Sequence, residues 1–534
     1  MHDQHRAVLR AAVLPLAVTA ITLRSLAHPG YLVQIDSAYG LRTVPVDWSF
    51  YSPVRLLTVL GQTLVGGAIT GRIYVCLALF LCGFSAMILL RIQPWWAQGA
   101  GGLLAMLNPF VYDRLVEGQW SIVVATAGLL FVVAAWLSLR HSPRPVAAIW
   151  LALSILLTLA FSADFAGILL LLVAGLALYA SAWRSPAFRR WTLAAGAGAV
   201  ALCAYGVLGF FLSTGPATYH HVAQFGPADF TAFRSTPAPG FGVFTALGGL
   251  YGEWSERLGR YLVADIQYPW WIASASLLVL LAIAGAVLDG GVGWLLALGA
   301  IGLVVSGSTA TRPGLSFVLT AVQHVPILAV YREPQKWDVL WLLALVVLAP
   351  AALVGVAAAL QRRAPRLRAA AGPALAAVMA AVVLAPAGWI ELTAASTVVR
   401  PVQYPQAWYE TAAYMGANVP AAEPVAILPW HLYEVLPFVG RPTVDPAPVF
   451  FPGNLVRSED PELPGGAAQD PIGTASRSGS ACALPTALLR AGIHHALVIE
   501  DATDGATAAA ALQRCGFRAV FERANQVALL TSAT

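Results

Sequence analysis

Long runs of apolar residues, separated by short polar segments, dominate the chain up to about residue 390. A helix that crosses a bilayer needs about 20 mostly apolar residues, because the hydrocarbon core is about 30 Å thick. The pattern predicts about eleven such spans, at 8–27, 72–91, 94–111, 120–139, 145–162, 165–183, 191–212, 270–288, 292–307, 338–360 and 369–390. Residues 53–69 are amphipathic and indicate a surface helix, whereas the shorter, interrupted run 314–329 favours a re-entrant or interfacial helix.

Arginine-rich loops orient these spans. Short loops at 139–145, 184–190 and 361–368 are rich in arginine, and the positive-inside rule places such loops in the cytoplasm. The predicted spans put all three on one side together with the N-terminus, and an odd number of spans then places residues 391–534 outside. The chain is therefore predicted to be a multi-pass plasma-membrane protein, with a cytoplasmic N-terminus and an exoplasmic C-terminal domain.

The predicted fold is an all-α membrane module, residues 1–390, followed by a small exoplasmic α/β domain, residues 391–534. Three long outer loops are predicted in the module, at 28–71, 213–269 and 308–337. In the tail, VAILPW, HHALVIED, FRAVFER and QVALLTS resemble short strands, and 503–514 resembles a helix. An exoplasmic location would permit a disulfide between Cys482 and Cys515, which the sequence leaves open.

Composition supports lipid as the solvent. Hydrophobic residues make up 58% of the chain and charged residues only 11%, whereas soluble domains carry about 25% charged residues. The net charge of +5 is spread over short loops without forming a basic patch, which argues against a nucleic-acid partner. The sequence contains no Gly-rich phosphate loop, no paired CxxC and no HExxH. It predicts no cofactor and no metal site, and a divalent metal has no support.

The first outer loop, HPGYLVQIDSAYGLRTVPVDWSFYSP, contains Asp36 and Asp47. A carboxylate at this position has the chemistry of a general base for a sugar hydroxyl. The alternative, which we favour for either aspartate taken alone, is that it caps a turn or a short helix. Arg42 in the same loop is a weaker candidate for a substrate contact.

The third long loop ends in AVYREPQKWDVLWLL. Lys336 is the only lysine among 31 basic residues, and in a helix it would share a face with Arg332. Two cations at the level of the lipid headgroups suit a phosphate, with arginine acting as a fork and lysine as a point charge. The alternatives are interfacial snorkelling beside Trp337, or neutralisation by Glu333 and Asp338.

Two further polar groups are candidates for substrate contacts. LNPFVYDRLVEGQW places Asp113, Arg114 and Glu117 in one short segment, for which a charge-paired turn, with Asp164 as a partner for Arg114, is the structural alternative. TYHHVAQF contains His220 and His221. Histidine can bind phosphate or carry a proton, but neighbours in sequence do not share a helix face, so this pair is no ready metal site. Most loop histidines do neither.

These features together resemble the GT-C integral membrane glycosyltransferases, which use polyprenyl-phosphate sugars as donors. An aspartate soon after the first helix, here Asp36, is followed by a surface helix, another long outer loop follows the seventh helix, and a soluble domain follows outside. YREPQKW is similar to the Arg…Lys-aromatic segment of actinobacterial cell-wall arabinofuranosyltransferase and mannosyltransferase-type proteins. Many members carry adjacent acids in the first loop, whereas here Ser37 follows Asp36, which leaves the base and the metal requirement open.

The resemblance implies an inverting transferase that moves a sugar from a polyprenyl phosphate to a cell-envelope glycan or lipid acceptor at the outer face of the membrane. Asp36 would deprotonate the acceptor hydroxyl. Arg332 and Lys336 would stabilise the departing phosphate, while Arg42, Asp47, His220 and His221 would make weaker contacts. Two other functions stay open. One is a transporter or flippase of a lipid-linked substrate, and the other is a non-catalytic scaffold with an exoplasmic binding domain.

Overall fold

The computed structural model describes residues 2–43, 46, 49, 51–178, 183, 185–214, 225–255, 270–364, 370–383, 389–460, 470–480, 482–523 and 525–532. The chain forms two compact units. Unit 1 contains Met1–Arg24, Asp47–Val54 and Tyr74–Val398, and unit 2 contains Ser25–Val46, Arg55–Ile73 and Val399–Thr534. Part of the first predicted outer loop therefore belongs with the C-terminal segment, whereas the sequence placed a single boundary near residue 390.

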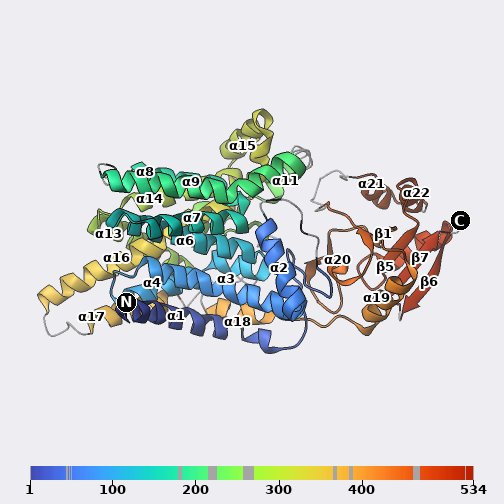
Figure 1. Ribbon diagram of the computed structural model, residues 1–534, viewed down its shortest axis with the longest axis horizontal. Helices are drawn as coiled ribbons and strands as arrows, with labels where there is room; N and C mark the ends of the chain where they lie inside the picture. Colours follow the sequence, from blue (N-terminus) through green and yellow to red (C-terminus); the bar gives the residue numbers. More distant parts are fainter. Residues whose placement is uncertain are drawn as a thin grey trace. The chain divides into compact units, whose positions relative to one another are not determined.

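Unit 1 is helical, and Figure 1 shows its long helices side by side. Its main helices are α1 (His2–Thr22), α4 (Trp95–Met106), α5 (Pro109–Glu117), α6 (Trp120–His141), α7 (Pro145–Phe161), α8 (Ala166–Leu178), α9 (Pro186–Gly209), α13 (Trp270–Leu288), α14 (Trp294–Ser306), α16 (Val339–Arg363), α17 (Ala371–Val383) and α18 (Trp389–Val398). Two helices, α2 (Ser52–Val65) and α3 (Gly67–Leu89), contribute residues to both units.

The apolar helices make this a multi-pass membrane protein. In the described part of the chain, five helices are long and apolar enough to span a bilayer: Gly67–Leu89, Trp120–His141, Pro186–Leu212, Trp271–Leu288 and Pro334–Arg363. Shorter apolar helices cover Leu9–Thr22, Pro145–Phe161, Ala163–Leu178, Trp294–Ser306 and Ala371–Ala381. The total of about eleven spans stays a prediction.

The single helix predicted over 94–111 is in fact two helices. Asn108 is extended, and its side chain accepts a hydrogen bond from the backbone N–H of Val111 at 3.1 Å. Pro109 occupies the first helical position of α5, where its missing N–H costs nothing. The chain therefore starts a new helix at Pro109, which brings the charged residues of α5 into the interior of unit 1.

Helix α16 forms the centre of unit 1, and α4, α13 and α14 pack against it. Its residues from Val339 to Leu353 are buried. Glycine allows the close approach: a Cβ on Gly285 of α13 would lie 2.0 Å from the Leu348 carbonyl oxygen, and one on Gly302 of α14 would lie 2.7 Å from that of Trp337. Small residues at such contacts are typical of helices that pack within membranes.

The two surface helices predicted by the sequence are α2 and α15 (Arg312–His324). Neither helix buries a residue. Leu56, Leu57 and Leu60 on α2 and Phe317 on α15 are exposed. Apolar side chains on an otherwise polar helix suit the boundary between headgroups and acyl chains.

Unit 2 is built on a five-stranded sheet with the order β4-β1-β5-β7-β6. Its strands are β1 (Pro424–Leu428), β4 (Asn454–Val456), β5 (His495–Ile499), β6 (Phe517–Arg523) and β7 (Val527–Ser532). β1 runs parallel to β4 and β5, and β7 runs antiparallel to β5 and β6. The four strand-like sequences of the tail thus form β1, β5, β6 and β7, and the helix predicted at 503–514 is α23 (Gly505–Arg514).

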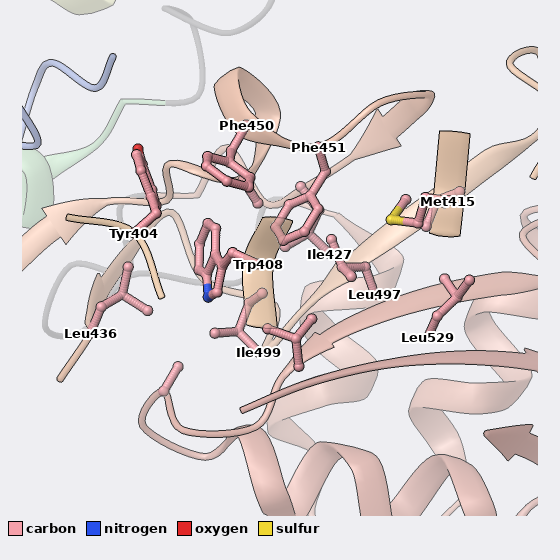
Figure 2. Close-up of a cluster of buried hydrophobic side chains, with 14 of the residues drawn as sticks. Tyr404, Trp408, Met415, Ile427, Leu436, Phe450, Phe451, Leu497, Ile499 and Leu529 are labelled. Carbon is pink, nitrogen blue, oxygen red and sulfur yellow. The ribbon is translucent and has the colours of Figure 1, made fainter. Parts of the chain in front are cut away.

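Apolar layers cover both faces of this sheet, because successive strand residues point to opposite sides. Val425 and Ile427 contact Trp408 of α19 (Gln406–Asn418) and the cluster around it. Figure 2 shows Trp408 beside Phe450 and Phe451, with Ile427, Leu497 and Ile499 on the neighbouring strands. The opposite face packs against α22 (Ala483–Arg490) and α23, through residues such as Leu488 and Leu512. The disulfide Cys482–Cys515 is formed, across a Cα–Cα distance of 5.7 Å.

Asp445 is a buried acid in unit 2. Its Oδ1 accepts a hydrogen bond from the Ala447 N–H at 2.9 Å. Burial raises the pKa of Asp445 from 3.8 to about 6, although this hydrogen bond and Arg457 oppose the shift. Between these two values the unfolded chain has lost the proton and the folded chain has kept it, so stability falls as the pH rises through this window.

We predict that Asp445→Asn removes this loss of stability with rising pH. An amide cannot ionise, and its oxygen can still accept the hydrogen bond from the Ala447 N–H. The free energy of unfolding of the wild-type protein should fall by up to about 3 kcal/mol between pH 4 and 6.5. Thermal melting of the full chain in detergent across that range measures the effect. Glu459→Gln, at an exposed acid of the same unit, is the control. A pH slope that is equal in wild type and Asp445→Asn would contradict the assignment.

Candidate functional site

The charged residues of α5 form a buried network in unit 1. Every residue of α5 is buried, and Gly118, with a φ of 85°, ends the helix. Arg114 is 1% exposed. Its Nη1 lies 3.1 Å from Oε2 of Glu117 and 3.6 Å from Oε1 of Glu253, and it donates a hydrogen bond to Oε1 of Gln119 at 2.6 Å. One guanidinium therefore lies between two buried carboxyl groups.

Ser255 joins the two carboxyl groups from the other side. Its hydroxyl donates to Oε1 of Glu117 at 3.0 Å, and its backbone N–H donates to Oε2 of Glu253 at 2.6 Å. Burial raises the pKa of Glu253, and Arg114 and Ser255 oppose that rise. The expected pairing of Arg114 with Asp164 is wrong, because Arg114 pairs with Glu117 and Glu253 while Asp164 pairs with Lys336.

A small polar pocket adjoins this network. It is lined by Phe110, Asp113, Arg114, Leu247, Leu250, Tyr251, Gly252, Glu253, Gln335 and Asp338. The volume of this pocket is about 10 Å³, enough for about one water molecule. Leu250 has a φ of 63°, a strained conformation for leucine that the surrounding packing must hold. Asp113 and Arg114 thus lie too deep for a bulky substrate in this conformation.

The segment with Arg332 and Lys336 is not an α-helix. It forms two short 3-10 helices, η8 (Pro326–Tyr331) and η9 (Pro334–Asp338), with Arg332 and Glu333 between them. A 3-10 helix has three residues per turn, so residues four apart do not share a face as they would in an α-helix. The two cations accordingly contact different groups.

Lys336 is neutralised by carboxylates. Its Nζ forms an ion pair with Asp164, and lies 3.4 Å from Oε2 of Glu333. The predicted alternative that Glu333 neutralises Lys336 is therefore confirmed, whereas Asp338 lines the pocket beside Arg114. Burial would raise the pKa of Glu333, but Lys336, Arg332 and Arg114 outweigh it and lower the pKa. Burial, followed by the charge of Asp164, raises the pKa of the nearby Tyr51.

Arg332 lies against aromatic rings. Its guanidinium carbon is 4.0 Å from the ring centre of Phe225 and 4.8 Å from that of Phe233. Such cation–π contacts hold a guanidinium in a fixed plane. Within the described part of the chain, its Nε has no hydrogen-bond acceptor. Arg332 therefore has an N–H donor available for a ligand, whereas the ammonium group of Lys336 is already paired with two carboxylates.

The other predicted site residues belong to unit 2 or lie outside the described residues. Asp36 and Arg42 belong to unit 2 and are exposed. Oδ1 of Asp36 lies 3.4 Å from the Tyr433 hydroxyl, and the Arg42 backbone N–H donates to the Val449 carbonyl at 2.8 Å. Asp47, His220 and His221 lie outside the described residues. The convergence of Asp36 with Arg332 and Lys336 stays a prediction.

Sequence reasoning missed Glu253, Ser255, Gln335 and Phe233. They are distant along the chain from the groups they contact; Ser255, for example, lies 138 residues after Glu117. Contacts of this kind leave no spacing pattern along the chain that could have predicted them. Among the described residues, no group of three or more His, Cys, Asp or Glu side chains is arranged to hold a metal ion.

The chain shares its fold with solved GT-C glycosyltransferases. No family model and no curated protein sequence matches the chain. The chain is similar in structure to the arabinofuranosyltransferase AftD from Mycobacteria, with a TM-score of 0.61 and 16% identity over 99% of this chain and 40% of that protein. A mutant of AftD gives a TM-score of 0.54 at 15% identity, covering 99% of this chain and 42% of that one.

A third similar structure is ArnT from Cupriavidus metallidurans bound to undecaprenyl phosphate, with a TM-score of 0.41 and 15% identity over 99% of this chain and 98% of that one. The chain spans less than half the length of the mycobacterial protein. At these identities the likeness is one of fold, which confirms the resemblance seen in the sequence.

We predict that Arg114→Met destabilises the protein by about 3–5 kcal/mol, because it leaves two buried carboxyl groups without a cation. Thermal melting in detergent measures the loss. The triple variant Arg114→Met, Glu117→Gln, Glu253→Gln should recover most of it, since the buried charges are then removed together. Arg312→Met, at the exposed start of α15, is the control. Equal melting temperatures for wild type and Arg114→Met would show that the ion pairs do not hold this region.

Proposed function

We propose that this protein is a membrane glycosyltransferase that transfers a sugar from a polyprenyl-phosphate donor to a cell-envelope glycan or lipid acceptor, with inversion at the anomeric carbon. The observation that carries the proposal is the GT-C fold, which the chain shares with AftD over 99% of its own length. AftD is named as an arabinofuranosyltransferase.

Asp36 is the proposed general base. It lies at the tip of a turn and is exposed, so an acceptor hydroxyl can approach it. In the proposed step, Asp36 takes the hydroxyl proton while the acceptor oxygen forms a bond to the anomeric carbon. The bond from that carbon to the phosphate oxygen breaks, and the polyprenyl phosphate leaves with the electron pair. A phosphate leaving group needs little protonation, so the step requires no separate acid.

Arg332 is the stronger candidate for the phosphate. Its guanidinium is fixed by Phe225 and Phe233, and a preorganised cation stabilises the charge that grows on the leaving phosphate. Lys336 would have to exchange Asp164 or Glu333 for the phosphate, which weakens its net attraction. We assign Lys336 a supporting role, in which its two ion pairs fix the 3-10 segment that presents Arg332. Arg42, Asp47, His220 and His221 remain candidates for weaker contacts.

The proposed location is the plasma membrane, with unit 2 outside the cell. The disulfide Cys482–Cys515 supports this side, because disulfides persist in oxidising compartments and are rare in the cytoplasm. The sequence adds the arginine-rich loops, which the positive-inside rule assigns to the cytoplasm.

Asp36→Asn should lower transfer from a labelled polyprenyl-phosphate sugar at least 100-fold, because the amide cannot accept the proton. Purified protein in lipid vesicles, supplied with such donors and cell-envelope acceptors, gives the rate. Asp289→Asn, an exposed acid of unit 1, should keep the wild-type rate. Full turnover by folded Asp36→Asn would reject Asp36 as the base. Movement of the donor across the bilayer without a new glycosidic bond would instead identify a flippase.

Arg332→Gln should lower kcat/KM for the donor about 10-fold or more, because a charged hydrogen bond to the phosphate, which strengthens as charge grows on the leaving group, is lost. The same vesicle assay, with the donor concentration varied, measures this change. Arg312→Gln provides the matched substitution at an exposed arginine outside the site. An unchanged donor KM and an unchanged kcat in Arg332→Gln would remove this residue from the phosphate site.

A further inference from the structure

The turn that presents Asp36 has a defined backbone conformation. The Gln34 N–H donates to the Ser37 carbonyl at 2.7 Å, and the Tyr39 N–H donates to the Leu32 carbonyl at 2.9 Å. Val33 and Ala38 form an antiparallel bridge across the turn. Asp36 thus lies at the tip of a small hairpin, although no regular strand is assigned here.

The C-terminal part of unit 2 holds this hairpin. β2 (Tyr433–Val435) and β3 (Pro442–Val444) form an antiparallel ribbon. The Gln34 carbonyl accepts from the Val444 N–H at 3.1 Å and from the Thr443 hydroxyl at 2.8 Å. Arg441 donates through Nη2 to the Val33 carbonyl at 3.0 Å. Two hydrogen bonds from β3 and one from Arg441, the residue before it, therefore hold Val33 and Gln34, which lie three and two residues before Asp36.

Packing locks the hairpin in the same place. Val33 is fully buried and belongs to the apolar cluster around Trp408. Tyr31 forms an antiparallel bridge with Val402. Gly40 is a close backbone contact, since a Cβ there would lie 2.4 Å from the Val449 carbonyl oxygen. The hairpin is therefore a built-in part of unit 2 and is oriented by residues more than 350 positions later in the chain, 409 in the case of Gln34 and Thr443.

Tyr433 connects the ribbon to the carboxylate itself. Its hydroxyl lies 3.4 Å from Oδ1 of Asp36, longer than an ordinary O–H···O hydrogen bond. Catalytic hydrogen bonds are often long without substrate and shorten when the substrate binds. A hydroxyl that donates to the ionised form of an acid orients it and favours that form.

We propose that the β2–β3 ribbon of the C-terminal segment is the positioning element of the active site, and that Tyr433 is the residue through which it acts on Asp36. The inference rests on the proposed function, in which Asp36 is the base. It assigns the C-terminal segment a part in the chemical step. Tyr433 is a positioning residue, because it acts through Asp36.

The first test is independent of activity. Thr443→Val removes the hydroxyl that donates to the Gln34 carbonyl while keeping the size of the side chain. Hydrogen exchange of the full-length protein in lipid nanodiscs, followed by mass spectrometry, should show about fivefold faster exchange over residues 31–39 and no change in β5. Thr474→Val is the control, because Thr474 also donates to a backbone carbonyl, that of Asp470. Unchanged exchange over residues 31–39 would overturn the proposal, whatever the protein catalyses.

The second test measures the chemical step. Tyr433→Phe should lower kcat about 3- to 10-fold, leave the donor KM within twofold, and move the acid limb of kcat/KM to higher pH. The shift has this direction because the ionised Asp36 loses a hydrogen-bond donor, so its pKa rises. Tyr414→Phe, in which the ring stacked on Phe521 is kept, is the control and should change neither kcat nor the pH profile.

A double-mutant cycle separates the possible failures. If Tyr433 acts through Asp36, Asp36→Asn and the double variant Asp36→Asn, Tyr433→Phe have the same residual rate. Two results would overturn the role of Tyr433 and leave the proposed function standing. One is a double variant whose rate loss is the product of the two single losses, and the other is a fall in kcat for Tyr433→Phe without a shift of the acid limb. Wild-type turnover in Asp36→Asn would reject the base and this inference together, whereas the exchange experiment would still show whether the ribbon holds the hairpin.

Discussion

The structure of unit 1 depends on pairing charges that have been removed from water. An isolated ion costs several kcal/mol in an apolar interior, and the buried cations Arg114 and Lys336 each have a carboxylate partner from a distant part of the chain. Arg114 of α5 binds Glu253 from the loop after α12 (Val243–Gly248), and Lys336 of η9, the 3-10 helix before α16, binds Asp164. Because the two partners of each pair come from distant segments, the pairs also bring these segments together: α5 with the loop after α12, and η9 with the segment that contains Asp164.

Hydrophobic pattern and local chemistry predicted most of the elements. The four strand-like sequences of the tail and the helix near 503–514 are present, since alternation and turn residues are local properties. The break at Asn108–Pro109 and the helix that follows it were not predicted, because the span was drawn as one helix over 94–111. The nine residues of α5 are too few to cross a bilayer, and hydropathy alone does not distinguish them from the preceding apolar run.

The sequence selected candidate residues for the site, but it did not predict which groups these residues contact. Arg332, Lys336, Asp113 and Arg114 all belong to unit 1, and their common side of the membrane stays a prediction. Besides local partners such as Glu333, the cations contact segments far along the chain, such as Asp164, which is separated from Lys336 by 172 positions. Whether residues 326–338 form an α-helix or 3-10 turns also depends on that packing, because Pro326 and Pro334 permit both.

The interleaving of unit 2 along the chain has a consequence for synthesis. Ribosomes add about 5–20 residues per second, so roughly 20–80 s pass between the emergence of Gln34 and that of Thr443, 409 residues later. During this delay Val33 has no Trp408 to pack against. The apolar segment around Val33 therefore stays unfolded while the membrane helices are inserted. Such a chain has an early segment exposed to aggregation or to a chaperone, and its maturation is complete only after the last strand has been translated.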